Sequence, residues 1–205
     1  MIKIWGRTTS SNVQKVMWAI GEIGLACERV DIGGPFGKNR EPAYLAINPN
    51  GLVPTLEEDG FFLWESNSIV RYLGGKHGRI EPSEPRIRAS AHQWMDWQLS
   101  VAGPAIGPVF LGLVRTPPEK RDHAAIAAAK AKTIEAMTIL DGQLAKTHYV
   151  AGADFSYGDI PIGVVARRFF DLVTERPKLA NLERWYGEIA GRPAFREHVS
   201  AIALV

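Results

Sequence analysis

The chain has 205 residues, of which 46% are hydrophobic and 22% charged, a composition typical of a globular protein and not of a disordered or collagen-like chain. Lys and Arg number 24 against 22 Asp and Glu, for a net charge of +2, so we expect no nucleic-acid partner. The single cysteine, Cys27, excludes an internal disulfide and a cysteine-based metal cluster. The five histidines show no close paired spacing, so we expect no bound metal.

The N-terminal sequence MIKIWGRTTSS lacks the long apolar segment of a signal peptide, which favours a cytoplasmic protein. A second stretch, between Asp96 and Arg115, contains no charged residue and approaches the ~18 residues that a membrane span needs. Pro104 and Pro108 interrupt its helical hydrogen bonding. We therefore interpret this stretch as a kinked, buried helix of a soluble protein and expect no membrane partner.

The first 80 residues alternate between strand and helix patterns. A β-branched run at 2–6 precedes apolar residues at helical spacing that end near Gly24, and 27–32 alternates like a strand. A strand, a helix and a strand within about thirty residues form a βαβ unit, so the two strands should be parallel. The remaining elements expected are a short helix at 41–46, two strands joined by a turn at Asp59-Gly60, and a helix at 66–77.

The segment that follows, Glu81-Pro82-Ser83-Glu84-Pro85, has the composition of a linker. Beyond it we find no strand pattern, and helices are expected from about Arg86 and at 119–145, 157–172, 178–190 and 194–201. The sequence therefore predicts an α/β domain at 1–80 with the order β-α-β-α-β-β-α, a linker at 81–88, and an all-α domain at 89–205.

A cluster of hydroxyl side chains, Thr8 to Ser11, stands immediately before the first predicted helix. Ser11 and Gln14 match a capping box, which makes Ser11 the expected N-cap. That assignment leaves the hydroxyl of Ser10 unused near the positive end of the helix, where an anion is stabilised. No Asp/His pattern accompanies it, so hydrogen bonding to a bound anion is a more natural role for Ser10 than nucleophilic attack.

Two further features could bind a ligand. Ser66 is the expected N-cap of the helix at 66–77, and the free amides of that helix end could bind a carboxylate while Glu65 pairs with an ammonium group. Val53-Pro54 opens a predicted strand, where a proline is tolerated at a sheet edge. Each feature alone is explained better by ordinary folding.

Taken together and in this order, these features resemble the glutathione S-transferase family over the whole chain. The resemblance rests on the segments SSNVQKV, NPNGLVPTL, ESNSIVRYL, FSYGDI and RPAF, and on the all-α second half. SSNVQKV is similar to the serine-type active-site turn of phi and theta-like bacterial members. In FSYGDI, Ser156 and Asp159 fit an N-capping box. The resemblance implies a thioredoxin-like α/β N-terminal domain followed by a helical bundle.

The resemblance also implies roles for the residues before the first helix and the third strand. Ser10 matches the serine that donates a hydrogen bond to the glutathione sulfur and stabilises its thiolate, with Thr9 and Ser11 as rivals for that contact. Ser11 is in either case expected at the glutathione site. Pro54 matches the cis-proline of the family, and the backbone of Val53 is then expected to pair with the cysteinyl part of glutathione.

The remaining implied contacts hold the two ends of glutathione. Glu65 and Ser66 match the pair that binds the γ-glutamyl head, and Arg40, preceded by Asn39, falls where a basic residue binds the glycyl carboxylate. For the electrophile pocket the candidates are Trp5, Arg7, Phe110 and Arg115, although aromatic residues on helices more often belong to the core.

The resemblance predicts a glutathione transferase that attacks small apolar electrophiles, with glutathione as co-substrate, no metal, and a homodimeric assembly. No tyrosine or cysteine stands at the active position, and Cys27 is expected to be a small core residue. The SSCSWR-type turn of the maleylacetoacetate isomerase class is also absent. Two alternatives stay open: glutathione-dependent peroxide reduction or isomerisation with the same residues, and a non-catalytic binding or scaffold protein on the same fold.

Overall fold

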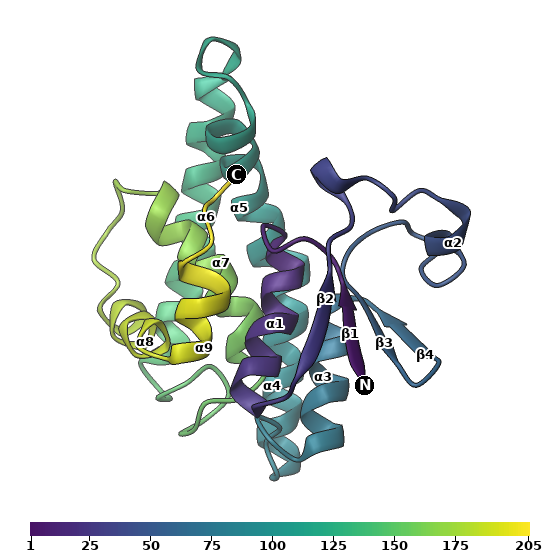
Figure 1. Cartoon of the computed structure of the whole chain (residues 1–205). Helices are drawn as coiled ribbons and strands as arrows, with labels where there is room; N and C mark the ends of the chain where they lie inside the picture. Colours follow the sequence, from purple (N-terminus) through teal and green to yellow (C-terminus); the bar gives the residue numbers. More distant parts are fainter. The chain divides into compact units, whose positions relative to one another are not determined.

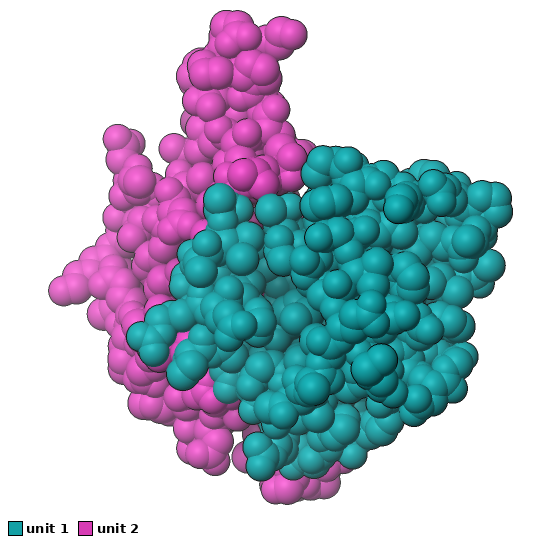
Figure 2. Space-filling view, in the orientation of Figure 1, with its two compact units in different colours: residues 1–81, 193–203 teal, residues 82–192, 204–205 magenta.

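The structure, a computed structural model, describes all 205 residues. It contains two compact units, residues 1–81 with 193–203 and residues 82–192 with 204–205 (Figure 2). This division differs from the expected one in two places. A helix begins at Pro85, inside the expected linker 81–88, and residues 193–203 belong to the N-terminal unit and not to the helical domain predicted for 89–205.

The C-terminal segment joins the first unit through aromatic packing. Its helices are α9, Pro193–Phe195, and the π-helical turn η5, Arg196–Ser200. The ring of Phe195 meets that of Trp18 edge to face, with centroids 4.8 Å apart, and both side chains are fully buried. Such an aromatic pair stabilises by about 1 kcal/mol beyond the area it buries. Hydrophobic periodicity relates only residues close in sequence, so it cannot predict a contact between Trp18 and Phe195, which lie near opposite ends of the chain.

The first unit is built on a four-stranded sheet with the order β2-β1-β3-β4 (Figure 1). β1 is parallel to β2 and antiparallel to β3, and β3 is antiparallel to β4, which confirms the predicted βαβ unit. The predicted order β-α-β-α-β-β-α is likewise confirmed, with one added 3₁₀ turn, η1. The elements are β1 Ile2–Trp5, α1 Ser11–Ile23, β2 Cys27–Val30, η1 Gly34–Phe36, α2 Pro42–Leu45, β3 Thr55–Glu58, β4 Phe61–Trp64 and α3 Ser66–His77.

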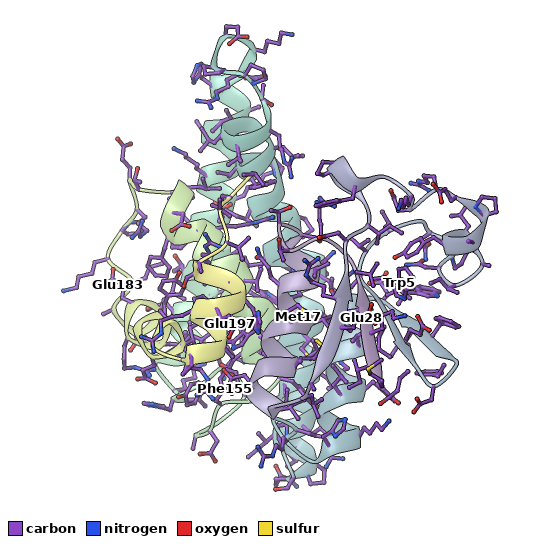
Figure 3. The ribbon with its side chains drawn as sticks, viewed as in Figure 1. Trp5, Met17, Glu28, Phe155, Glu183 and Glu197 are labelled. Carbon is purple, nitrogen blue, oxygen red and sulfur yellow. The ribbon has the colours of Figure 1, made fainter.

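The two faces of the sheet differ because side chains alternate along each strand. Ile4 and its cross-strand neighbour Leu56 are fully buried, on the face that α1 and α3 cover (Figure 1). On the opposite face the indole nitrogen of Trp5 donates to the Glu57 carboxylate at 2.8 Å, and Figure 3 shows Trp5 on the far side of the strands from Met17 of α1. α1 and α3 also pack against each other, and residues at their N-terminal ends, Asn12 and Ser66, line one pocket.

Two predicted turns are confirmed by their backbone angles. Gly24 ends α1 in the left-handed conformation, with φ of 81°, and its N–H donates to the carbonyl of Ile20, as expected of a C-cap glycine. Asp59 and Gly60 have φ of 50° and 83°, which is what a two-residue type I′ hairpin turn requires. Cys27 is a free, half-buried thiol in β2, and burial raises its pKa.

The second unit is entirely helical, as the sequence predicts. Its elements are α4 Pro85–Trp97, η2 Gln98–Ala102, α5 Gly103–Phe110, η3 Leu111–Arg115, η4 Pro118–Lys120, α6 His123–Leu144, α7 Asp159–Leu172 and α8 Ala180–Ala190. Ten of the 14 residues of α7 are buried. α7 packs against α4, α5 and α8 and is therefore the core helix of this unit.

The long apolar helix Pro85–Arg115 is less buried than the sequence analysis predicts. The run Pro85–Arg115 is one helix, long and apolar enough to cross a membrane by length and composition alone, and only 28% of its most apolar window is buried. The prediction of a buried helix was therefore wrong for most of this window. The π turns η2 and η3 shift the hydrogen-bond register around Pro104 and Pro108, so the helix continues through both prolines.

Asp159 organises the start of α7 and is completely buried. It accepts hydrogen bonds from the Ser156 N–H at 3.0 Å, the Val150 N–H at 3.0 Å and the indole of Trp185 at 2.9 Å. Burial outweighs these bonds and raises the pKa of the carboxyl to about 6. Half of the expected box is thus present, because Asp159 accepts from the Ser156 N–H while the Ser156 hydroxyl accepts from the Gly158 N–H at 3.2 Å. Asp159 also ties a loop and α8 to α7.

Candidate functional site

A pocket in the first unit lies where the loop before β3 meets the starts of α1 and α3. It contains four of the residues expected to bind glutathione, Val53, Pro54, Glu65 and Ser66. The other lining residues, which sequence reasoning missed, are Asn12, Asn48, Asn50, Leu52 and Trp64. Asn48, Asn50 and Leu52 belong to the segment NPNGLVPTL. The two asparagines of that segment were the sequence signal that could have identified them as pocket residues. Ser10 and Ser11 do not line the pocket but immediately precede Asn12 in the chain.

The start of α1 differs from the predicted cap by one residue. Ser10, with φ −80° and ψ 122°, is the N-cap, and its side chain makes no capping hydrogen bond. The capping box of Ser11 and Gln14 is therefore wrong, because the Gln14 amide instead donates to the carbonyl of Thr8 at 3.3 Å. The first turn holds no acidic residue. The positive end of α1 and the Ser10 hydroxyl are both left available to an anion.

The start of α3 shows the same shift. Glu65 is the N-cap, so the expectation that Ser66 caps the helix is wrong, and the Glu65 carboxylate makes no capping bond. Glu65 has φ of 71° and ψ of 108°, a conformation that costs a non-glycine residue about 1–3 kcal/mol and that concentrates at functional sites. Ser66 is buried at the first helical position. An exposed acid thus stands beside the open amides of a helix end.

The peptide bond between Val53 and Pro54 is cis, as the resemblance implied. The N–H and C=O of Val53 make no hydrogen bond within the chain, and both residues line the pocket. An unpaired donor and acceptor on one extended residue can bind a peptide-like ligand in the manner of an added strand.

The turn beside the pocket is held by buried polar side chains. Asn48 donates to the carbonyl of Leu52 at 2.9 Å and to the hydroxyl of Thr55 at 3.0 Å. The hydroxyl of Tyr44, on α2, donates to the same Leu52 carbonyl at 2.6 Å. These bonds fix the backbone that leads into Val53, so the pocket wall is preorganised by residues with no predicted role.

Asn39 and Arg40 do not line the pocket but contact the turn that does. The Asn39 amide donates to the Gly51 carbonyl at 2.7 Å, and the Arg40 guanidinium donates to the Asn50 carbonyl at 3.1 Å. A Cβ on Gly51 would lie 2.8 Å from both the Arg40 guanidinium and the Asn39 carbonyl oxygen. Both predicted residues therefore brace this wall of the pocket.

Two of the residues proposed to line an electrophile pocket, Trp5 and Arg7, belong to the first unit but do not line this pocket. The indole of Trp5 lies in a separate pocket with Ile32, Tyr44 and Phe62, on the face of the sheet opposite α1, so its assignment to the electrophile pocket is not supported. The Arg7 side chain lies against Gly34. Phe110 and Arg115 belong to the second unit.

Family models and curated relatives both match this chain. The glutathione S-transferase N-terminal domain family matches residues 5–84 and the C-terminal domain family matches 103–193. The glutathione S-transferase GstB of Escherichia coli K12 is 42% identical over 97% of this chain and 98% of its own. Glutathione S-transferase 3 of Zea mays is 30% identical over 99% of this chain and 95% of its own.

A solved structure extends the match to three dimensions. The theta-class glutathione S-transferase of Xanthomonas axonopodis pv. citri, crystallised with glutathione bound, superposes with a TM-score of 0.95 at 44% identity, covering 100% of this chain and 99% of the other. The chain belongs to the glutathione S-transferase family and has its fold, and its enzyme class is that of a glutathione S-transferase.

Proposed function

We propose that this transferase joins the glutathione thiolate to small apolar electrophiles and that Ser10 is the catalytic residue. The observation that carries the proposal is the N-cap position of Ser10, whose hydroxyl makes no capping bond at the positive end of α1. A hydroxyl placed there can donate to a sulfur anion while the helix end stabilises its charge.

The chemistry requires the glutathione sulfur as thiolate, because the thiolate is the nucleophile. A free thiol has a pKa near 8.5, and lowering it by two units takes about 2.7 kcal/mol. One charge-assisted hydrogen bond and a helix end supply most of that amount. The sulfur electron pair then forms the C–S bond, and the leaving group departs with the electron pair of the broken bond.

Five kinds of contact can hold the rest of glutathione in and beside the pocket. The free backbone groups of Val53, beside Pro54, pair with the cysteinyl segment. Ser66 and the open amides of α3 bind the γ-glutamyl carboxylate, and Glu65 binds the ammonium group. The remaining contacts are Ser11 near the sulfur and Arg40 near the glycyl carboxylate, with Asn39 and Arg40 each bonded to the turn at Asn50 and Gly51.

We further propose a cytoplasmic homodimer. Exposed apolar side chains on the long helix Pro85–Arg115, among them Leu99 at 46% and Leu111 at 56% exposure, are suited to contact with a second copy rather than with a membrane. The free thiol of Cys27 fits a reducing compartment. A peroxidase, isomerase or scaffold role is not favoured, since no feature of the site selects one of them.

The test is an ultraviolet difference spectrum of the protein with glutathione at neutral pH. We expect a thiolate absorbance band with glutathione and none with S-methylglutathione, which occupies the same pocket without a free thiol. A panel of neutral electrophiles, such as 1-chloro-2,4-dinitrobenzene, should then be converted to thioethers. A protein that does not bind glutathione at millimolar concentration would overturn the proposal in favour of a scaffold.

Replacing Glu65 by glycine should raise the stability of the protein and weaken its binding of glutathione. Glu65→Gly should raise the free energy of unfolding by about 1 kcal/mol, because glycine adopts the positive φ without strain. The same change should weaken glutathione binding about tenfold by removing the partner of the ammonium group. Urea titration measures the first effect and calorimetry with glutathione the second.

The matched control is Asp59→Gly, which relieves a second positive φ on the hairpin turn, away from the pocket. Its glutathione affinity should equal that of the wild type. If Glu65→Gly also keeps the wild-type affinity, the carboxylate of Glu65 has no part in binding.

A further inference from the structure

A second pocket of the first unit lies on the face of the sheet opposite α1, the side on which Figure 3 shows Trp5. We call it the outer pocket. Its volume is about 300 Å³, within the range of small-molecule sites. Its aromatic lining comes from three elements, with Trp5 on β1, Tyr44 on α2 and Phe62 on β4. α2 has only four residues, and Phe62 remains 38% exposed, so the outer pocket is open to a ligand from solvent.

Two of the aromatic rings are held in place by the fold. The rings of Trp5 and Tyr44 meet edge to face, with centroids 6.4 Å apart. The Tyr44 hydroxyl is bonded to the Leu52 carbonyl at 2.6 Å and to the Thr55 hydroxyl at 2.8 Å. The Trp5 indole donates to the Glu57 carboxylate at 2.8 Å. A ligand that binds against these two rings therefore does not have to order them.

The charged side chains of the outer pocket are two glutamates and one lysine, Glu41, Glu57 and Lys38. Glu57 uses one carboxylate oxygen for the Trp5 indole, and its other oxygen makes no hydrogen bond within the chain. Glu41 and Lys38 are both exposed, and no ion pair joins them. Carboxylates thus outnumber ammonium groups in the lining, and part of their capacity to bind a cation is unused.

This face of the sheet already attracts one cation. The Lys3 ammonium lies 5.4 Å from the centroid of the Trp5 ring, within the distance of a cation–π contact. It lies 4.0 Å from the Glu57 oxygen that is bonded to Trp5, and 3.7 Å from the Glu28 carboxylate. Lys3 is therefore shared between two acids, and it leaves the second oxygen of Glu57 for a cationic ligand.

We propose that the outer pocket binds a small organic cation with a quaternary ammonium head and an apolar body. The π faces of Trp5, Tyr44 and Phe62 attract such a head, and Glu41 and Glu57 supply its counter-charge. A quaternary head carries no N–H, so it needs no hydrogen-bond acceptor from an apolar wall. The apolar body is accommodated by the aliphatic lining residues, Ile32, Ala43 and Ile47. No residue of the outer pocket lines the pocket proposed for glutathione, so the binding does not depend on that function.

The experiment is calorimetric titration of the full chain, without glutathione, with benzyltrimethylammonium as the probe. Benzamide and benzoate, which carry the same ring with no charge and with a negative charge, are the comparison ligands. The wild type should bind benzyltrimethylammonium more tightly than either. Glu57→Gln should weaken this binding about fivefold, because it removes the charge and keeps an acceptor for the Trp5 indole. Lys38→Gln should strengthen it about twofold, because it removes a like charge.

The contribution of the rings is tested on two neighbouring residues of β4. Phe62→Leu keeps an apolar side chain in the outer pocket but removes a π face, and it should weaken benzyltrimethylammonium binding about threefold. Phe61→Leu is the matched control. The Phe61 ring lies on the other face of the sheet, with its centroid 5.4 Å from that of Tyr72 on α3, so its loss should leave the affinity unchanged.

Equal affinity of the wild type, Glu57→Gln and Phe62→Leu for benzyltrimethylammonium would overturn the proposal, and so would the absence of binding. Benzoate bound as tightly as benzyltrimethylammonium would overturn the assignment to cations, since Lys38 would then be the group that selects the ligand. Should Glu57→Gln fail to fold, the opposite changes expected from Phe62→Leu and Lys38→Gln decide the question.

Discussion

Replacing Ser10 by alanine is expected to lower kcat/KM for conjugation roughly 10- to 100-fold, the value of one hydrogen bond to a charged group. The variant should fold normally, because the Ser10 side chain makes no capping bond that alanine would lose. The thiolate band of bound glutathione should weaken at neutral pH, since the pKa of its thiol moves back toward 8.5. Steady-state kinetics and the difference spectrum measure the two effects.

Ser11→Ala and Thr9→Ala are the controls for this result, because each removes one hydroxyl from the same turn. Neither should lower kcat/KM more than about threefold, since the structure makes Ser10 the cap residue and Ser11 the first residue of α1. If Ser10→Ala keeps full turnover and the band, Ser10 is the wrong residue. A large loss in one of the controls would then identify the hydroxyl that contacts the sulfur.

The second large effect concerns stability. Asp159→Ala should lower the free energy of unfolding by about 4 kcal/mol, because it leaves several buried N–H donors without an acceptor. These donors are the backbone amides of Val150 and Ser156 and the indole of Trp185. Urea unfolding followed by tryptophan fluorescence measures the loss. Asp122→Ala, which removes an exposed cap from α6, is the matched control and should cost about 1 kcal/mol.

The pH dependence of stability separates this role from simple capping. The pKa of the Asp159 carboxyl is raised from 3.8 to about 6 in the folded protein. Between these values the native state binds more protons than the unfolded state, so this group makes stability fall as pH rises toward 6. That contribution should be missing in Asp159→Ala. An unchanged pH profile would show that the buried carboxyl titrates as it does in the unfolded chain.

Local sequence patterns predicted most elements of the first unit correctly, for a physical reason. The parallel pairing of β1 and β2 follows from the short helical connection between them, and the turn at Asp59-Gly60 follows from residues that tolerate positive φ. The expected bounds of the helix at 66–77 are those of α3, but the N-cap residues of α1 and α3 were each misplaced by one position. Several hydroxyl and amide side chains near the start of α1 could bond to the free backbone amides of its first turn. The Gln14 side chain instead donates to the carbonyl of Thr8 and forms no capping box.

The sequence by itself determined the family and the two kinds of architecture, because these depend on local periodicity and ordered motifs. It also predicted candidate residues for a glutathione site, four of which line one pocket. Only the tertiary structure showed that the hydroxyl of Ser10 is unused, that Asn48 holds the wall of the pocket, and that residues 193–203 return to the first unit. Each of these depends on which distant groups meet, and such contacts leave no periodic signal in the chain.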